Sequence, residues 1–382
     1  MDFALAEEQQ LLRRSVERLF ADRYTFDARK RFMQEERGWS LDLWKHYAEL
    51  GLLGLPFDED HGGSAGGPVE TMIVMEEIGR ALALEPYLAT VVLAGGLVRL
   101  GGSTALRADV LPKIAAGELR VSFAHAERQA RYDLADVAAS ARRDGGGYVL
   151  DGAKSLVLQG DSAEQFVVSA RLSGGQRDRD GLGLFLVDAA ASGVSTRGYG
   201  TVDGQRAAEV TLTGVRVAAG AAIGEPGAAY PLIERVADGA IAALCAEAVG
   251  AMAAMHETTV EYLKTRKQFG VTIGSFQALQ HRAAEMLVAL EQARSMAMLA
   301  TMMAGEDDAR ERRAAISAAK VQIGRSGRSL GQAAIQLHGG IGMTMEAKVG
   351  HYFKRLTTID AMFGDADYHL GLLGASGGLI AA

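Results

Sequence analysis

Hydrophobic side chains recur every three or four positions through the first part of the chain, which is the period of an amphipathic α-helix. Two such stripes are clear, one over residues 5–20 and one over residues 72–82. Between them, residues 50–56 (LGLLGLP) and 61–63 (HGG) are rich in glycine, a pattern that indicates a helix end followed by a loop. The pattern predicts an α-helical region that extends to about residue 117.

Short β-type runs replace the helical period between residues 118 and 225. Glycines at residues 145–147, 174–175 and 204 separate these runs as turns. The four clearest runs, rich in valine, leucine and phenylalanine, are residues 148–152, 165–170, 182–187 and 209–212. Short strands at this spacing predict a small β-barrel or sandwich.

Three long segments with a helical period follow Pro226-Gly227, where the β pattern ends. They are rich in alanine, methionine and arginine, which favour helices, and they cover residues 231–268, 276–304 and 309–337. Helices of this length predict a bundle, completed by a fourth helix near the C-terminus. We therefore expect an α+β multidomain fold with domains at residues 1–117, 118–225 and 226–382.

Composition narrows the class of protein. With 382 residues, 48% of them hydrophobic, the chain is long enough for two or three domains, each with its own core. The net charge of −7 opposes binding to a phosphate backbone, so we expect no nucleic-acid partner. The single cysteine, Cys245, excludes an internal disulfide and any site built from several cysteines, and no metal is expected.

The sequence shows no strong pattern of a membrane-spanning helix or of a targeting peptide. The longest apolar stretch without a charge, residues 86–98, is far shorter than the roughly 20 residues that span a bilayer. The first residues include Asp2, Glu7 and Glu8 instead of the basic start of a signal or transit peptide. We expect a soluble cytoplasmic protein with no membrane span.

Two clusters in the C-terminal region have the residue types that bind an anion. In the first, YLKTRKQFG at residues 262–270 is followed by SFQ at residues 275–277. Basic residues and a glycine are, however, also typical of an ordinary helix C-terminus. In the second, QLHGGIG at residues 336–342, the paired glycines form either a plain turn or a backbone whose N–H groups approach a diphosphate. Together, an arginine fork, an amide and a glycine pair predict a site for the phosphates of a dinucleotide.

The helical–β–helical order, with RKQFG, SFQ and QLHGGIGMT, resembles the acyl-CoA dehydrogenase flavoproteins over essentially the whole chain. The resemblance implies an N-terminal α-helical domain, a central β domain and a C-terminal four-helix bundle, with FAD at a subunit interface. By that pattern, the residues that contact FAD are Arg266, Gln268, Phe269, Gln277, Gln336, Gly339 and Gly340.

The resemblance also implies a reaction, the α,β-dehydrogenation of an acyl-CoA thioester. In this family a carboxylate removes the α-proton while the β-hydrogen leaves as hydride to flavin N5. The α-proton is weakly acidic, so its removal needs a placed base and stabilisation at the carbonyl oxygen. An electron-transfer flavoprotein or a similar acceptor, and a role in lipid catabolism such as β-oxidation, are implied in the same way.

Neither of the family's usual base positions holds a carboxylate in this chain. Counted from the two motifs, one position is Phe363 and the other is Ala240. Glu247 lies seven residues past Ala240, on nearly the same helix face, in an apolar run where a glutamate is costly without a task or a partner. We predict Glu247 as the base, the alternative being a buried glutamate paired with a basic group on a facing helix. Asp365 is the second candidate, with capping of the last helix as its alternative role.

The segments that would surround the flavin ring depart from the family pattern as well. Phe123 is kept, and His125 could donate to the flavin, although a lone histidine on a strand is more often structural. The family's tryptophan and hydroxyl residues are replaced, for example by the leucines and valine at residues 156–158. The phosphate side of the site is therefore kept while the ring side is altered.

This asymmetry resembles the small subunit of two-component acyl-CoA dehydrogenases, such as the pimeloyl-CoA and steroid-side-chain types. Two hypotheses follow. Either the chain is an FAD-dependent dehydrogenase, in a homo- or hetero-oligomer, that uses Glu247; or it is a non-catalytic subunit that completes the FAD site of a partner chain. The alanine- and methionine-rich faces of residues 276–304 and 309–337 offer a candidate subunit interface.

Overall fold

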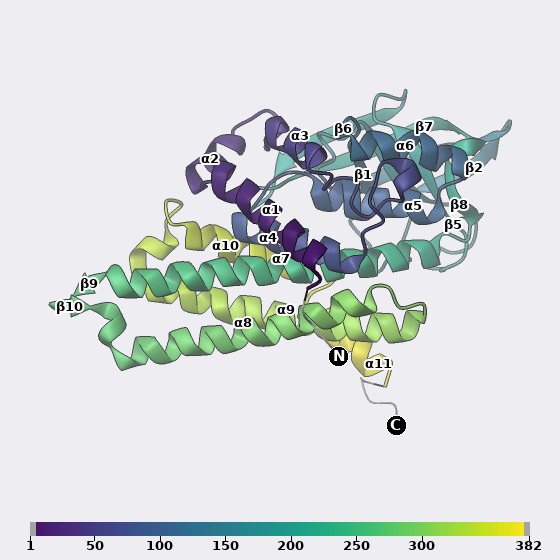
Figure 1. Cartoon of the computed structure of the whole chain (residues 1–382). Coiled ribbons are helices and arrows are strands. Elements are labelled where there is room, and N and C mark those ends of the chain that lie inside the picture. Colours follow the sequence, from purple (N-terminus) through teal and green to yellow (C-terminus); the bar gives the residue numbers. More distant parts are fainter. Residues whose placement is uncertain (1–4, 378–382) are drawn as a thin grey trace. The chain divides into compact units, whose positions relative to one another are not determined.

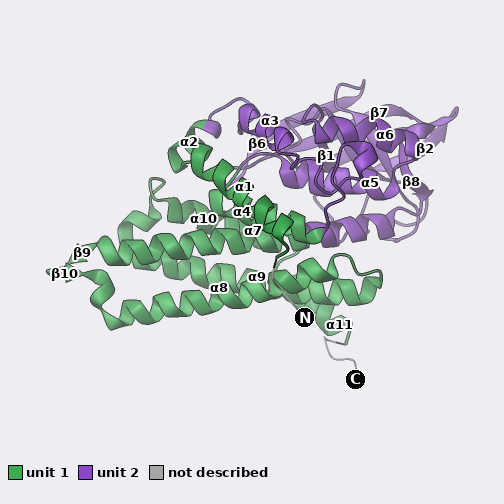
Figure 2. Cartoon of the chain, viewed as in Figure 1, with its two compact units in different colours: residues 1–31, 68–83, 241–382 green, residues 32–67, 84–240 purple. Residues whose placement is uncertain are grey.

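A computed structural model describes residues 5–377 and confirms the helical–β–helical order along the chain (Figure 1). The described residues group into two compact units (Figure 2). Within the described residues, unit 1 combines residues 5–31, 68–83 and 241–377, whereas unit 2 combines Phe32–Gly67 and Leu84–Ala240. Each unit therefore combines segments from distant parts of the chain. The division into three domains, with boundaries at residues 117 and 225, stays a prediction.

The first part of the chain is helical, as its hydrophobic period predicts. Two of its helices begin at serine caps, since Ser40 Oγ accepts from Leu43 N and Ser103 Oγ from Leu106 N. A π-helical segment, η2, follows α4 after a short connection. The elements are α1 (Glu7–Arg23), α2 (Phe26–Phe32), α3 (Leu41–Glu49), η1 (Glu59–His61), α4 (Pro68–Ala81), η2 (Leu88–Gly95), α5 (Gly96–Gly101) and α6 (Thr104–Ala115).

Unit 2 contains the sheet. Its strand order is β6-β7-β3-β2-β4-β5-β8, with β1 parallel to β4. The four predicted runs lie in β3, β4, β5 and β7, while β1, β2, β6 and β8 were not among them. The strands are β1 (Val121–Ala124), β2 (Ser140–Asp144), β3 (Gly147–Leu158), β4 (Gln165–Arg171), β5 (Leu182–Asp188), β6 (Val194–Gly200), β7 (Arg206–Ala218) and β8 (Ala222–Gly227).

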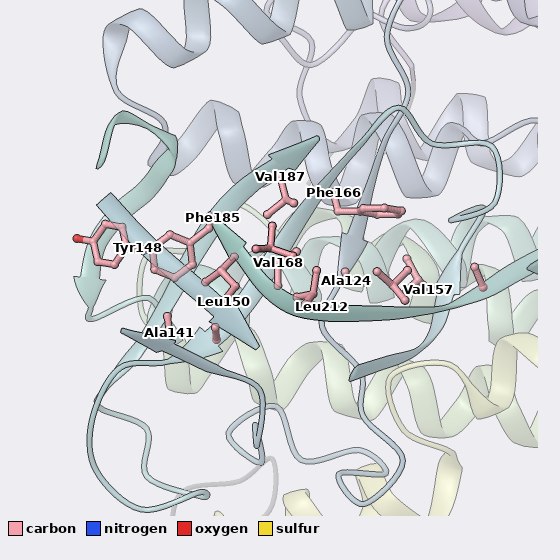
Figure 3. Close-up of a cluster of buried hydrophobic side chains, with 14 residues drawn as sticks. Ala124, Ala141, Tyr148, Leu150, Val157, Phe166, Val168, Phe185, Val187 and Leu212 are labelled. Carbon is pink, nitrogen blue, oxygen red and sulfur yellow. The ribbon is translucent and has the colours of Figure 1, made fainter. Parts of the chain in front are cut away.

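One face of this sheet encloses an apolar core, to which Leu150, Phe166, Val168 and Phe185 belong (Figure 3). Ala124 of β1 belongs to the same core. Because side chains alternate along a strand, Phe123 lies on the opposite face of the sheet.

The C-terminal helices are α7 (Tyr230–Thr265), α8 (Gln277–Met303), α9 (Ala309–His338), α10 (Lys348–Ala361) and α11 (Ala366–Ala375). The predicted first helix extended to residue 268, but α7 ends at Thr265 and a two-stranded hairpin, β9 (Lys267–Gln268) with β10 (Val271–Thr272), precedes α8. Asp308 caps α9 by accepting from the backbone N–H groups of Arg310 and Glu311.

Two glycines let α4 approach α7 closely within unit 1. A Cβ on Gly79 would collide with the backbone carbonyl of Glu247, and one on Gly250 would collide with that of Glu76. In length and composition α7 could cross a membrane, but 94% of its most apolar window is buried in the protein. Such burial is typical of a core helix.

Candidate functional site

The first anion-binding cluster lies at one end of the unit 1 helices, where α7 stops and the β9–β10 hairpin turns the chain back. Gln268 pairs with Val271 across this hairpin, whose turn places Phe269 and Gly270 at positive φ. The Phe269 ring is 90% exposed and meets the Phe276 ring edge-on, with centroids 6.2 Å apart. The hairpin therefore presents its side chains outward from the helices.

The second cluster lies at the same end. The chain reverses between α8 and α9 over residues 304–308, and the two helices pack together, so the start of α8 lies beside the end of α9. In addition, the rings of Tyr262 in α7 and His338 in α9 stack with centroids 4.5 Å apart. We call residues 262–277 and 336–342 together the tip of unit 1.

Glycine at the tip leaves the backbone open. Gly339 ends α9 with φ 64° and ψ −143°, a conformation that essentially only glycine adopts. Apart from the adjoining backbone, no atom of residues 5–377 lies within 4 Å of a Cβ built on Gly339 or on Gly340, so packing within the described part of the chain does not demand glycine at Gly340. Open space beside bare backbone is the cradle that a phosphate group can enter.

Polar groups at the tip are free to bind a ligand. Within residues 5–377, no hydrogen bond or ion pair engages the side chains of Arg266, Gln277 or Gln336, and all three are exposed. Gln268 differs, since its Nε2 donates to the Lys267 carbonyl at 2.8 Å. The α8 N-terminus has Phe276 as its N-cap residue, with no side-chain cap, so its first N–H groups favour an anion. These residues fit the diphosphate of FAD.

Glu247, the predicted catalytic base, forms an ion pair with an arginine inside unit 1. Its Oε1 accepts from Arg355 Nε at 2.5 Å and its Oε2 from Arg355 Nη2 at 2.8 Å. Glu247 is only 2% exposed, and Arg355 projects from α10. Both carboxylate oxygens are therefore engaged, in the arrangement that the sequence allowed as the alternative to catalysis.

Asp365, the second candidate, caps the last helix. Its Oδ1 accepts from Tyr368 N at 2.8 Å at the start of α11. The preceding turn holds Phe363 at φ 56°. Two buried groups fix that turn, because Lys320 Nζ donates to the Gly364 carbonyl at 2.6 Å and His369 Nε2 lies 3.1 Å from the Phe363 carbonyl.

A carbonyl oxygen only accepts, so His369 carries its proton on Nε2 and accepts at Nδ1 from Ser317 Oγ. Burial lowers the pKa of His369 to about 4, which keeps the ring neutral. The turn that carries Phe363 is thus held from two sides by buried groups of the same unit.

On the sheet of unit 2, the Phe123 and His125 rings stack with centroids 5.1 Å apart. His125 is buried, and its Nδ1 lies 2.9 Å from Ser169 Oγ. Burial lowers its pKa to about 3. His125 therefore has a partner inside the protein, as the structural alternative supposed.

A buried lysine connects His125 to Glu127. Lys154 Nζ donates to Glu127 Oε1 at 2.6 Å, to Ser169 Oγ at 3.0 Å and to the His125 carbonyl at 3.2 Å. Burial lowers the pKa of Lys154 to about 8, against the attraction of Glu127. Burial by itself would raise the pKa of Glu127, but the charge and hydrogen bonds around it, chiefly those of Lys154, lower it.

The partners of the candidate residues were not predicted. Lys154 stands in an apolar strand, where a charged residue signals a buried partner, and Arg355 lies on the face of α10 that also carries Tyr352 and Ile359. The charges of Lys154 and Arg355, each among apolar neighbours, could have indicated from the sequence that each has a buried acidic partner. Which acid each one meets depends on tertiary packing.

Comparisons with known proteins match the chain along nearly its whole length. Family models match residues 6–118 (acyl-CoA dehydrogenase, N-terminal domain), 122–215 (middle domain) and 234–377 (C-terminal domain). The probable acyl-CoA dehydrogenase YngJ of Bacillus subtilis is 29% identical over 351 residues, which are 91% of each chain.

Two solved structures are similar in fold and sequence. A variant of the Tcur3481-Tcur3483 steroid ACAD has a TM-score of 0.87 and 30% identity, over 97% of each chain. The ChsE4-ChsE5 complex from Mycobacterium tuberculosis has a TM-score of 0.88 and 25% identity, over 100% of each chain.

Proposed function

Because this chain belongs to the acyl-CoA dehydrogenase family, we propose that it works in the α,β-dehydrogenation of an acyl thioester as one subunit of an enzyme with two unlike subunits. The chain is an FAD-dependent oxidoreductase, and the reaction of its family is flavin-dependent dehydrogenation of acyl-CoA or carrier-bound acyl groups. When bound, FAD accepts the hydride that leaves the β-carbon. The proposal concerns which part of this work the residues of this chain perform.

In this proposal the tip of unit 1 holds the diphosphate side of FAD. Arg266 gives charge-assisted hydrogen bonds, Gln277 and Gln336 supply amide groups, and Gly339 and Gly340 admit the backbone close to the phosphates. Gln268 and Phe269 flank the diphosphate from the hairpin. The support is that these groups are exposed while Arg266, Gln277 and Gln336 have no partner in the described chain.

The base that removes the α-proton comes from the second subunit in this proposal. The observation that carries it is the bidentate Glu247–Arg355 pair, since a carboxylate with both oxygens bound to a guanidinium is poorly placed to accept a proton. Asp365 is likewise engaged as a helix cap. Phe123 faces away from the apolar sheet core and is proposed to line the flavin side, with His125 stacked behind it.

A second candidate keeps Glu247 as the base, with the chain itself completing the reaction. It requires Arg355 to release at least one oxygen of Glu247 when the thioester binds. Its support is position, because Glu247 lies on the first long C-terminal helix, where part of the family presents its carboxylate.

Partners and location follow as proposals. ChsE4-ChsE5, which shares the fold, is a complex of two named chains, and a similar pairing is proposed for this chain. The electron acceptor is proposed to be an electron-transfer flavoprotein or a similar protein, and the location cytoplasmic. The exposed apolar residues Leu287 and Val288 on α8 suit a subunit interface.

The test is flavin bleaching by acyl-CoA in the assembled enzyme, measured per bound FAD by stopped flow. The variant Glu247→Gln/Arg355→Gln removes both charges of the pair, so neither is left buried alone. We expect its rate to stay within a few-fold of wild type. A loss of about 10²–10⁴, the usual contribution of a general base, would instead establish Glu247 as the base. Asp365→Asn serves as the matched change at the second candidate and should also leave the rate within a few-fold.

The same preparation tests the partnership. The chain purified alone should be colourless or weakly flavin-loaded, and co-expression with a second acyl-CoA dehydrogenase chain should give stoichiometric FAD. A fully flavin-loaded chain that is active without a partner would contradict the two-subunit proposal.

A further inference from the structure

The two halves of the tip are joined by one ring contact. Tyr262 lies four residues before Arg266, and His338 directly precedes Gly339. Their rings stack with centroids 4.5 Å apart and planes inclined by 21°. The contact therefore bridges the helix that ends at the arginine and the helix that ends at the glycine pair.

The His338 ring has a fixed orientation before any ligand binds. Its Nδ1 lies 2.9 Å from the Ala334 carbonyl, one helical turn back, and a carbonyl only accepts, so Nδ1 carries the proton. The residue is 7% exposed, and burial lowers its pKa, which keeps the ring neutral. A neutral, anchored ring is a firm surface for Tyr262 to stack on.

We propose that Tyr262 and His338 are a positioning pair for FAD: their stack sets the separation between the Arg266 guanidinium and the Gly339–Gly340 turn so that both reach the same diphosphate. The inference rests on the proposed FAD contacts of the tip and adds residues that act through them. When the binding groups of a site already hold the bound geometry, less conformational entropy is lost as the ligand binds, and the affinity is therefore higher.

The experiment titrates FAD into the apo form of the purified oligomer. Tyr262→Leu keeps apolar volume but removes the ring, and FAD affinity should fall about tenfold. Tyr262→Phe keeps the stack and should bind FAD within about twofold of wild type. The control is Phe20→Leu, which breaks the Phe20–Tyr24 ring pair of α1 in the same unit, centroids 5.6 Å apart. It should lower the thermal unfolding temperature but leave FAD affinity unchanged.

A double variant separates this inference from the proposed function. If Arg266→Ala leaves FAD affinity unchanged, the proposed contacts of the tip fail. If Arg266→Ala weakens FAD but Tyr262→Leu does not, only the positioning role fails. We expect Tyr262→Leu/Arg266→Ala to lose clearly less affinity than the product of the two single losses, because misplacing an arginine matters only while it is present. Fully multiplicative losses would overturn the positioning role, even if Tyr262→Leu lowers stability.

Discussion

Arginines in the interior of unit 1 and at its tip differ in what they bind. Arg355 is buried and gives two hydrogen bonds to Glu247, whereas Arg266 is exposed and has no partner within the described chain. Burial makes an unpaired charge costly, so interior charges find partners in the fold. A charge that stays unpaired beside open glycine backbone is available to a ligand. In this protein, therefore, residues committed to structure are distinguished from those proposed to bind FAD by whether the chain itself supplies their partners.

The largest effect expected from this comparison concerns the interior pair. Glu247→Gln leaves the Arg355 guanidinium buried without its counter-charge, and the free energy of unfolding should fall by about 3–5 kcal/mol. Urea denaturation of the apo protein measures it. The double variant Glu247→Leu/Arg355→Met should recover most of the loss, since no lone charge remains. A loss below about 1 kcal/mol in Glu247→Gln would mean that the pair is not structural and would restore Glu247 as a candidate base.

A second interior carboxylate, Glu77, offers a sharper contrast, because its ion pair is longer than that of Glu247. Glu77 on α4 is 6% exposed, and Arg80 Nε lies 3.9 Å from its carboxylate. Burial raises its pKa from 4.5 to about 7. The folded protein therefore holds this proton more tightly than the unfolded chain does. The stability it contributes is full below about pH 4.5 and is lost as pH rises to about 7.

Across that window the loss should be about 3 kcal/mol, and Glu77→Gln should remove it. Urea unfolding measured from about pH 4.5 to about pH 7 gives the slope. Glu261→Gln, at an exposed glutamate of α7, is the control and should keep the wild-type slope. An unchanged slope in Glu77→Gln would show that folding does not raise the pKa of Glu77.

Hydrophobic period and motif spacing predicted the arrangement of helices and strands, and much of the tip. Segments 231–268, 276–304 and 309–337 correspond to α7, α8 and α9, and α8 begins at Gln277, the last residue of SFQ, one residue after the predicted start. These features depend on local propensity, which a sequence contains. The β9–β10 hairpin was missed because two-residue strands leave no periodic pattern.

The roles of individual charges could not be predicted from the sequence. Whether Glu247 is a base or half of an ion pair depends on Arg355, which lies 108 residues later in the chain. His125 and Lys154 show the same limit, since both depend on Ser169. Pairing across such distances follows from packing, which hydrophobic periodicity does not specify. The catalytic and FAD-binding assignments therefore stay predictions for the experiments described.

At the tip, the expected effect is on FAD and not on stability. Arg266→Ala should weaken FAD binding at least tenfold, because charge-assisted hydrogen bonds contribute about 1.5–3 kcal/mol. Its free energy of unfolding should stay within about 0.5 kcal/mol of wild type, as for most surface substitutions. Lys267→Ala removes the neighbouring exposed charge and should change FAD affinity much less. Equal losses in both variants would indicate a diffuse charge effect instead of a contact.

The smallest expected effect separates backbone strain from ligand contact at the two tip glycines. Gly340 has no positive φ, and beyond the adjoining backbone no atom of the described residues lies within 4 Å of an added Cβ, so Gly340→Ala should leave the apo protein as stable as wild type. If a phosphate lies against this backbone, however, the methyl group occupies its place and FAD affinity should fall several-fold.

Gly339→Ala is the comparison: at φ 64° the alanine strains the backbone, which should cost about 1–3 kcal/mol of stability even without FAD. Thermal unfolding of the apo forms and FAD titration measure both quantities. If Gly340→Ala binds FAD as tightly as wild type, the diphosphate does not approach this turn, and the contrast between the open tip and the paired interior must rest on the side chains of Arg266, Gln277 and Gln336, which are unpartnered within the described chain.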